Sequence, residues 1–250
     1  MAGHSHSANI RHRKAAVDNK RSKLWSKLSK AIIVAAKLGG GDPDANSRLR
    51  VAIQDAKSLS MPKDNIERAI KKGTGELDGG DVEETLYEGY GPGGVAVMCD
   101  IMTDNRNRTA PEIRKLFDVH GGSLGGAGCV SYLFDRKGVI VVPAETQDAE
   151  RIMEIAMENE ADDVQMMDDR IEILTTPDCL SKVTAALEQA GVAVELSQVA
   201  RIPQIQVDLD GETAQKVLKL LEALEDHDDV QGVSSNLNFE SESVAPLLHK

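Results

Sequence analysis

Lysines at helical spacing are the residues of this sequence best suited to chemistry with a charged partner. Four of them are separated by three, four and three positions: Lys20, Lys23, Lys27 and Lys30. On an α-helix these side chains would share one face. Neighbouring like charges destabilise a helix unless a polyanion neutralises them, so the spacing predicts phosphate binding. The alternative is a solvated helix face that binds nothing, although such faces ordinarily mix charges of both signs.

Charge is divided unequally along the 250 residues of the chain. Residues 1–72 contain 16 Lys+Arg and 6 Asp+Glu, a net +10, and the remaining residues contain 13 basic and 35 acidic side chains, a net −22. The sum of the two parts is −12. Because an acidic surface repels phosphate, we expect any nucleic acid to contact the N-terminal part.

A second polar candidate is the segment Asn105-Arg106-Asn107-Arg108. Asn and Arg side chains can hydrogen-bond phosphates or base edges. The alternative is a tight turn that precedes a helix, because Thr109 and Glu112 have the spacing of a capping box. The residues alone do not separate these two interpretations.

Several patterns argue against a cofactor, a metal site or an enzyme. Gly89, Gly91 and Gly94 match the dinucleotide fingerprint, but the match precedes a predicted strand instead of following one. His4 and His6 have no nearby cysteine, so no metal site is predicted. Neither a Ser-His-Asp nor a His-Glu-x-x-His signature is evident, and the paired aspartates resemble solvated turns. We therefore expect a protein without a cofactor that is not an enzyme.

Cysteine usage and hydropathy predict the compartment. The three cysteines are far apart and form no Cys-x-x-Cys pair, which argues against disulfides and zinc. No run of 18 apolar residues is present, and the N-terminus lacks the apolar core of a signal peptide. These features predict a cytoplasmic protein with no membrane partner.

Periodicity predicts an α+β fold with an N-terminal three-helix domain and two ferredoxin-like α/β domains, one inserted in the other. Helical spacing dominates residues 12–72, and a glycine-rich linker follows. Residues 129–202 have the order β-α-β-β-α-β, which is the ferredoxin-like motif. The predicted domains are a basic helical domain at 1–80, a discontinuous α/β domain at 81–128 and 203–250, and an inserted ferredoxin-like domain at 129–202.

Five segments closely resemble the YebC/PmpR family: Met1–Ser5, Asn9–Ala16, Ser60–Ile70, Glu88–Gly94 and Thr103–Thr109. The resemblance implies a helical first domain followed by two α/β domains. Members are commonly described as DNA-binding transcriptional regulators, and others are associated with ribosomes and with translation of proline-containing stretches. The sequence departs from the family at His6-Ser7, where a Lys and an aromatic residue are usual.

The leading hypothesis is a DNA-binding transcriptional regulator. The alternative is a ribosome-associated translation factor that contacts ribosomal RNA and relieves stalling, and a third hypothesis is a small-molecule sensor or enzyme that uses the α/β domains. The predicted nucleic-acid-binding residues are Arg11, His12, Arg13, Lys14, Lys20, Arg21, Lys23, Lys27, Lys30, Asn105, Arg106, Asn107 and Arg108.

Overall fold

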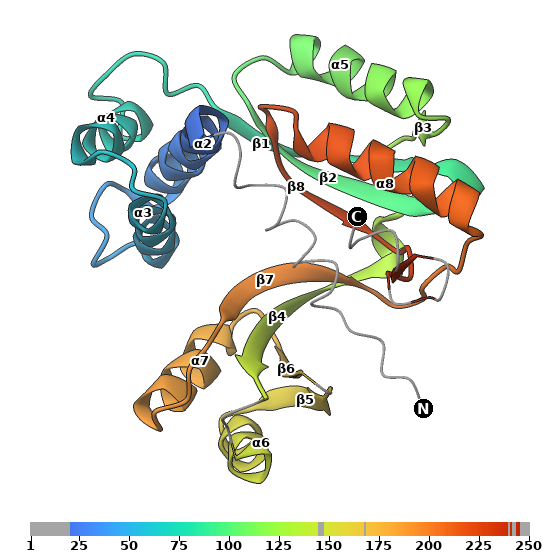
Figure 1. Ribbon diagram of the computed structural model, residues 1–250. Helices are drawn as coiled ribbons and strands as arrows, with labels where there is room; N and C mark the ends of the chain where they lie inside the picture. Colours follow the sequence, from blue (N-terminus) through green and yellow to red (C-terminus); the bar gives the residue numbers. More distant parts are fainter. Residues whose placement is uncertain (1–20, 145–147, 168, 240, 242–243, 246–250) are drawn as a thin grey trace. The chain divides into compact units, whose positions relative to one another are not determined.

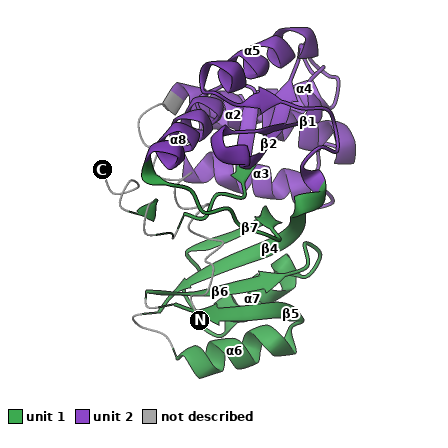
Figure 2. Ribbon diagram, turned by 90° about the vertical axis from the view of Figure 1, so that its right-hand side faces the viewer, with its two compact units in different colours: residues 1–12, 132–211, 234–250 green, residues 13–131, 212–233 purple. Residues whose placement is uncertain are grey.

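A computed structural model describes residues 21–144, 148–167, 169–239, 241 and 244–245 of the chain (Figure 1). The chain divides into two compact units (Figure 2). Unit 2 comprises Arg13–Ser131 and Glu212–Val233, and unit 1 comprises Met1–His12, Tyr132–Gly211 and Ser234–Lys250.

Unit 2 begins with three described helices: α2 (Arg21–Gly39), α3 (Ser47–Ser58) and α4 (Lys63–Gly73). Gly40 follows α2 with a φ of 84°, a left-handed conformation that glycine adopts without strain. The buried Asn46 then begins α3, because its side-chain oxygen accepts a hydrogen bond from the backbone N–H of Leu49. Its amide nitrogen donates to the carbonyl of Ala35, which ties the start of α3 to α2.

The helices α2 and α4 pack at close range at Gly73, the last residue of α4. A Cβ atom at this position would lie 2.5 Å from the Ile33 carbonyl oxygen and 2.7 Å from the Ala36 Cβ. The sequence indicates Gly73 as a helix stop, and the structure shows a second role, because the absent side chain permits this approach.

We expect Gly73→Ala to lower the free energy of unfolding by about 1–3 kcal/mol, because the added methyl group must displace the α2 backbone. Denaturant unfolding monitored by circular dichroism measures the change. The matched control is Lys71→Ala, which alters an exposed residue of the same helix. Equal stability of the two variants would contradict the close-packing argument.

The sheet of unit 2 has the strand order β3-β1-β2-β8. Its strands are β1 (Glu83–Tyr90), β2 (Ala96–Thr103), β3 (Ser123–Leu124) and β8 (Val230–Ser235). Strand β1 is antiparallel to β2 and to β3. A short 3₁₀ turn, η1 (Pro92–Gly94), connects β1 to β2. The last strand in sequence, β8, thus lies beside a strand formed more than a hundred residues earlier.

Two helices cover one face of this sheet, α5 (Arg106–Val119) and α8 (Gly211–Glu225) (Figure 1). Gly89 and Gly91 show this placement, because a Cβ at Gly89 would meet Phe117 of α5 and one at Gly91 would meet Leu220 of α8. Both Phe117 and Leu220 are fully buried. The polar residues of the candidate site lie at the start of α5 and directly after α8.

Unit 1 contains a second sheet with the order β5-β6-β4-β7. Its elements follow one another as β4 (Phe134–Pro143), α6 (Ala149–Glu158), β5 (Ala161–Met166), β6 (Arg170–Thr175), α7 (Leu180–Gln189) and β7 (Leu196–Pro203). A 3₁₀ turn, η2 (Ser131–Leu133), precedes β4. Strand β4 is antiparallel to both β6 and β7. Ile140 of β4 and Ile173 of β6 pair and pack with Ile152 of α6 and Leu187 of α7 in one apolar core.

The α+β class and the N-terminal helices followed by two sheets are confirmed. Two local predictions are wrong. The apolar residues at 205–209 indicate a strand, but the structure has only an isolated bridge there, between Val207 and Leu237. The glycine-rich run Glu88–Gly94 indicates a loop, but its first three residues belong to β1, which takes a central place in the sheet. The three domain boundaries stay a prediction. Among the described residues, no helix combines the length and apolar character needed to cross a bilayer.

Candidate nucleic-acid interface

Three predicted lysines of α2 contact the segment at the end of α8, and they are called here the lysine stripe: Lys23, Lys27 and Lys30. This segment, Glu225–Asp229, is called the acidic turn. Lys23 Nζ donates to the carbonyl and to the carboxylate of Asp226, at 3.1 and 3.0 Å. Lys27 Nζ donates to the carbonyl of Glu225. Both elements belong to unit 2, so α2 and the end of α8 are joined by these contacts.

The third lysine reaches the buried end of the acidic turn. Lys30 Nζ donates to the Asp228 carbonyl at 3.0 Å and forms an ion pair with the Asp229 carboxylate. The side chain of Asp229 is only 2% exposed. The other Asp229 oxygen accepts hydrogen bonds from Arg108 at 3.0 Å and from Thr109 at 2.6 Å. Asp229 therefore joins α2, α5 and the acidic turn.

The charge of Asp229 is maintained by these partners. Burial alone raises the pKa of Asp229, but the hydrogen bonds from Lys30, Thr109 and Arg108, together with the charge of Lys30, outweigh it. The pKa of Asp229 consequently lies far below its ordinary value. A buried carboxylate that stays ionised and holds two cations serves to fix the elements that carry them.

These contacts correct the prediction of an unneutralised lysine face. The chain itself supplies part of the negative charge that neutralises these lysines, because Lys23 pairs with Asp226 and Lys30 pairs with Asp229. Sequence periodicity places the lysines on one face but gives no information on a partner about 200 residues away. The other predicted N-terminal residues, Arg11, His12, Arg13, Lys14 and Lys20, lie outside the described residues, and Arg21 begins α2.

The Asn105–Arg108 segment is the beginning of α5 and not a separate turn. Asn105 is the N-cap, because its side-chain oxygen accepts from the Arg108 N–H at 3.2 Å. The predicted capping role of Thr109 is therefore wrong, and Thr109 is a buried partner of Asp229. Arg106 lies 3.9 Å from the Glu83 carboxylate, and Arg108 pairs with Asp104 and Asp229. Asn107 is exposed.

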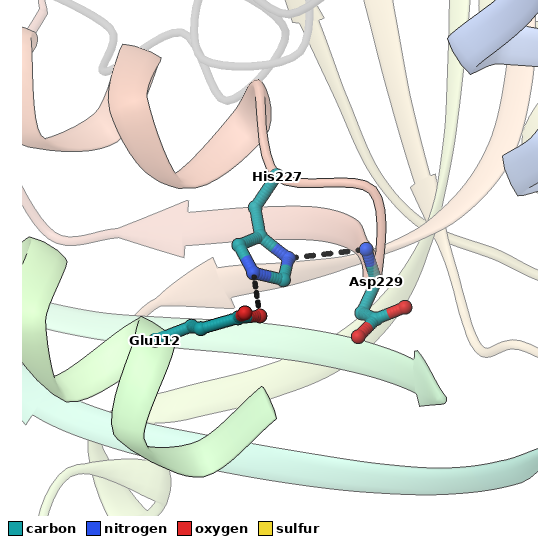
Figure 3. A group of neighbouring side chains, drawn as sticks. All are labelled: Glu112, His227 and Asp229. Atoms are coloured by element: carbon teal, nitrogen blue, oxygen red, sulfur yellow. Dashed lines mark hydrogen bonds and ion pairs between the residues drawn. The ribbon is translucent and has the colours of Figure 1, made fainter. Parts of the chain in front are cut away.

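His227 lies between Glu112 and Asp229 (Figure 3). Its Nε2 is 3.0 Å from Glu112 Oε2, and its Nδ1 accepts from the Asp229 N–H at 3.1 Å. The donor atoms of these residues lie within 4.8 Å of one another, a spacing that a metal ion could use. However, Lys30 and Arg108 already pair with the Asp229 carboxylate, and their positive charges would repel a further cation. The group is better explained as a cap on the acidic turn.

Exposed cations remain on the other two helices of the N-terminal segment. Lys57 of α3 and Arg68 and Lys71 of α4 are exposed. Within the described ranges, none of the three forms an ion pair. Arg50 of α3 donates to two backbone carbonyls, those of Pro43 and Asp44. The exposed cations of α3 and α4 are therefore available to bind an anionic partner.

Glu88 is a buried charge that no local sequence motif indicates. Its carboxylate accepts backbone hydrogen bonds from Gly128, Val130 and Ser131 at 2.8 to 2.9 Å. Burial raises the pKa of Glu88, but these hydrogen bonds outweigh it and lower the pKa. Burial and then the charge of Glu88 raise the pKa of the Cys129 thiol, which keeps that thiol protonated. Glu88 thus fixes the segment Gly128–Ser131 to β1.

Known proteins resemble this chain along its length. Residues 5–76 match the model described as the TACO1/YebC protein N-terminal domain, and residues 82–237 match the TACO1/YebC second and third domain. A probable transcriptional regulatory protein of Rhodopirellula baltica is 61% identical over 98% of this chain and 100% of its own length. One of Geobacter sulfurreducens is 52% identical over 99% of this chain and 100% of its own.

A solved structure shows the same fold. The crystal structure of a conserved hypothetical protein from Aquifex aeolicus has a TM-score of 0.81 and 55% sequence identity, and the match covers 93% of this chain and 96% of that one. The relatives from Rhodopirellula and Geobacter are named as regulatory proteins and not as enzymes. Their names agree with the expectation of a regulatory role.

Proposed function

Because the chain belongs to the TACO1/YebC family, we propose that it is a regulator of gene expression that binds nucleic acid, with duplex DNA as its partner. The names of its relatives support a regulatory role in transcription. The observation that carries the proposal is the segregation of charge, +10 in residues 1–72 against −22 in the rest. Phosphate contacts supply most of the affinity of sequence-independent binding.

The structure changes which cations are available for this binding. Lys57, Arg68 and Lys71 are exposed, and among the described residues no carboxylate pairs with them. In contrast, Lys30 is held at the buried Asp229. The proposed primary contact therefore uses the exposed faces of α3 and α4 together with the basic N-terminal residues, which lie outside the described part of the chain.

We expect the triple variant Lys57→Gln, Arg68→Gln and Lys71→Gln to bind duplex DNA at least about tenfold more weakly at moderate salt. Each lost phosphate contact reduces the slope of log affinity against log salt by about 0.9, so the slope should fall by roughly 2–3 units. Fluorescence anisotropy with a labelled duplex of mixed sequence, titrated at roughly 50 to 200 mM salt, gives both quantities.

The matched control removes three exposed lysines elsewhere: Lys115→Gln on α5, Lys182→Gln on α7 and Lys219→Gln on α8. Its net charge changes by the same amount. If this control loses as much affinity as the triple variant, then binding depends on total charge and not on α3 and α4.

A translation factor that contacts ribosomal RNA would use the same phosphate chemistry. Two measurements separate this alternative from DNA binding. The first compares the duplex with a structured ribosomal RNA fragment in the same assay, and the second follows sedimentation of the protein in lysate with and without nuclease. Co-migration with ribosomes and tighter RNA binding would overturn the proposal of a DNA partner, whereas protection of particular promoters would support it.

A further inference from the structure

The contact between the lysine stripe and the acidic turn has an exposed end and a buried end. The side chains of Lys23, Asp226 and Asp228 are 37%, 47% and 60% exposed. Those of Lys30 and Asp229 are 16% and 2% exposed. Exposed ion pairs contribute little and exchange readily with competing ions, whereas opening a buried pair leaves a charge without compensation. The exposed end can therefore open while the buried end stays closed.

The acidic turn offers the lysines the same kind of acceptor that a nucleic-acid backbone offers. Lys23 and Lys27 donate to carbonyl oxygens at the end of α8, those of Asp226 and Glu225. The carbonyls at a helix C-terminus carry the negative end of the helix dipole. The Asp226 carboxylate adds a full charge to this surface. Phosphate oxygens spaced along a nucleic-acid strand would present the same combination of acceptors and negative charge.

We propose that the acidic turn occupies the lysine stripe in place of nucleic acid, and that a phosphate backbone displaces Asp226 and Asp228 from Lys23 when the protein binds. This inference rests on the proposed function, because it concerns the regulation of the same basic segment. The Lys30–Asp229 pair remains closed and keeps α2 attached to α5 and α8. The protein consequently binds nucleic acid less tightly than its cations would allow.

The test is the double variant Asp226→Asn with Asp228→Asn, which retains the backbone carbonyls but removes both exposed charges. We expect its affinity for duplex DNA to rise roughly fivefold at moderate salt, the gain obtained when a surface ion pair no longer competes. The slope of log affinity against log salt should become steeper by about one unit, because Lys23 gains a phosphate. Fluorescence anisotropy with the labelled duplex measures both.

Two further variants separate this mechanism from a general effect of charge. Glu150→Gln with Glu154→Gln removes two exposed acids of α6 in unit 1 and changes the net charge equally. Adding Lys23→Gln to the Asp226 and Asp228 variant removes the cation that is predicted to be released. The gain should be absent from the first variant and abolished in the second.

The outcomes distinguish this inference from the proposed function. Binding by the wild-type protein without a gain in the double variant overturns the inference and leaves the proposed function standing. An equal gain in the α6 control, or a gain that persists with Lys23→Gln, also overturns it. If neither the wild-type protein nor the double variant binds DNA or RNA, both proposals are wrong.

Discussion

Asp229→Ala is expected to lower the free energy of unfolding by about 3–5 kcal/mol, the loss typical of one partner removed from a buried charged network. The substitution leaves Lys30 and Arg108 without the carboxylate that both contact. It also removes one of the acceptors of the Thr109 hydroxyl, and Thr109 is itself buried. Chemical denaturation followed by circular dichroism and by the fluorescence of Trp25 on α2 measures the change.

Two companion variants show whether the loss arises from the buried network. Asp228→Asn alters a neighbouring carboxylate whose side chain is 60% exposed, and its effect should remain below about 1 kcal/mol. Adding Lys30→Met to Asp229→Ala removes the isolated ammonium group, so the double variant should recover part of the lost stability. A loss for Asp229→Ala no larger than that for Asp228→Asn would contradict the central role assigned to Asp229.

Glu88→Gln is expected to lower the free energy of unfolding by about 3 kcal/mol, because hydrogen bonds to a charged acceptor contribute about 1.5–3 kcal/mol each. A carboxylate can accept from the N–H groups of Gly128, Val130 and Ser131 together, whereas one half of the amide is itself a donor. The matched control is Glu84→Gln on the same strand, since Glu84 is 47% exposed. A similar loss for both variants would contradict this account.

The contribution of Glu88 should also depend on pH in one direction. The pKa of Glu88 in the folded protein is lowered from 4.5, so its carboxylate stabilises the fold above that pH. This stabilisation is lost as the pH falls below about 4.5 and the carboxylate is protonated. The difference in unfolding free energy between wild type and Glu88→Gln should therefore shrink on acidification. A difference that stays constant from neutral to acidic pH would show that the charge of Glu88 is not responsible.

Local patterns were sufficient for most of the fold. The order of elements in 129–202 follows from alternation and helical spacing, and α8 follows from apolar residues such as Val217, Leu220 and Leu224. The sequence does not indicate the start of strand β1, because its first two residues, Glu83 and Glu84, are both acidic and exposed and show no alternation. Its place in the sheet is set by pairing with β2, which a local pattern does not contain.

The candidate site was predicted less well, for a related reason. The spacing of Lys23 and Lys30 correctly places them on one helix face, but their partners follow α8, near the other end of the sequence. Similarly, Asn105 and Thr109 are both good N-cap residues, and only the buried contact of Thr109 with Asp229 shows which role each has. Tertiary contacts determine which residues pair with a buried charge. Composition alone therefore predicts the sign of the partner's charge but not the partner's position in the sequence.

The separation of Lys23 from Asp226 has a consequence for the order of synthesis. These residues are 203 positions apart, and a ribosome that adds about 5–20 residues per second makes the second roughly 10–40 s after the first. The strand β8, which follows the acidic turn, is equally late. During this interval a newly made α2 has its positive charge but none of the three carboxylates of the acidic turn, those of Asp226, Asp228 and Asp229. The lysines of α2 consequently remain without these acceptors until the C-terminal part of unit 2 has been made.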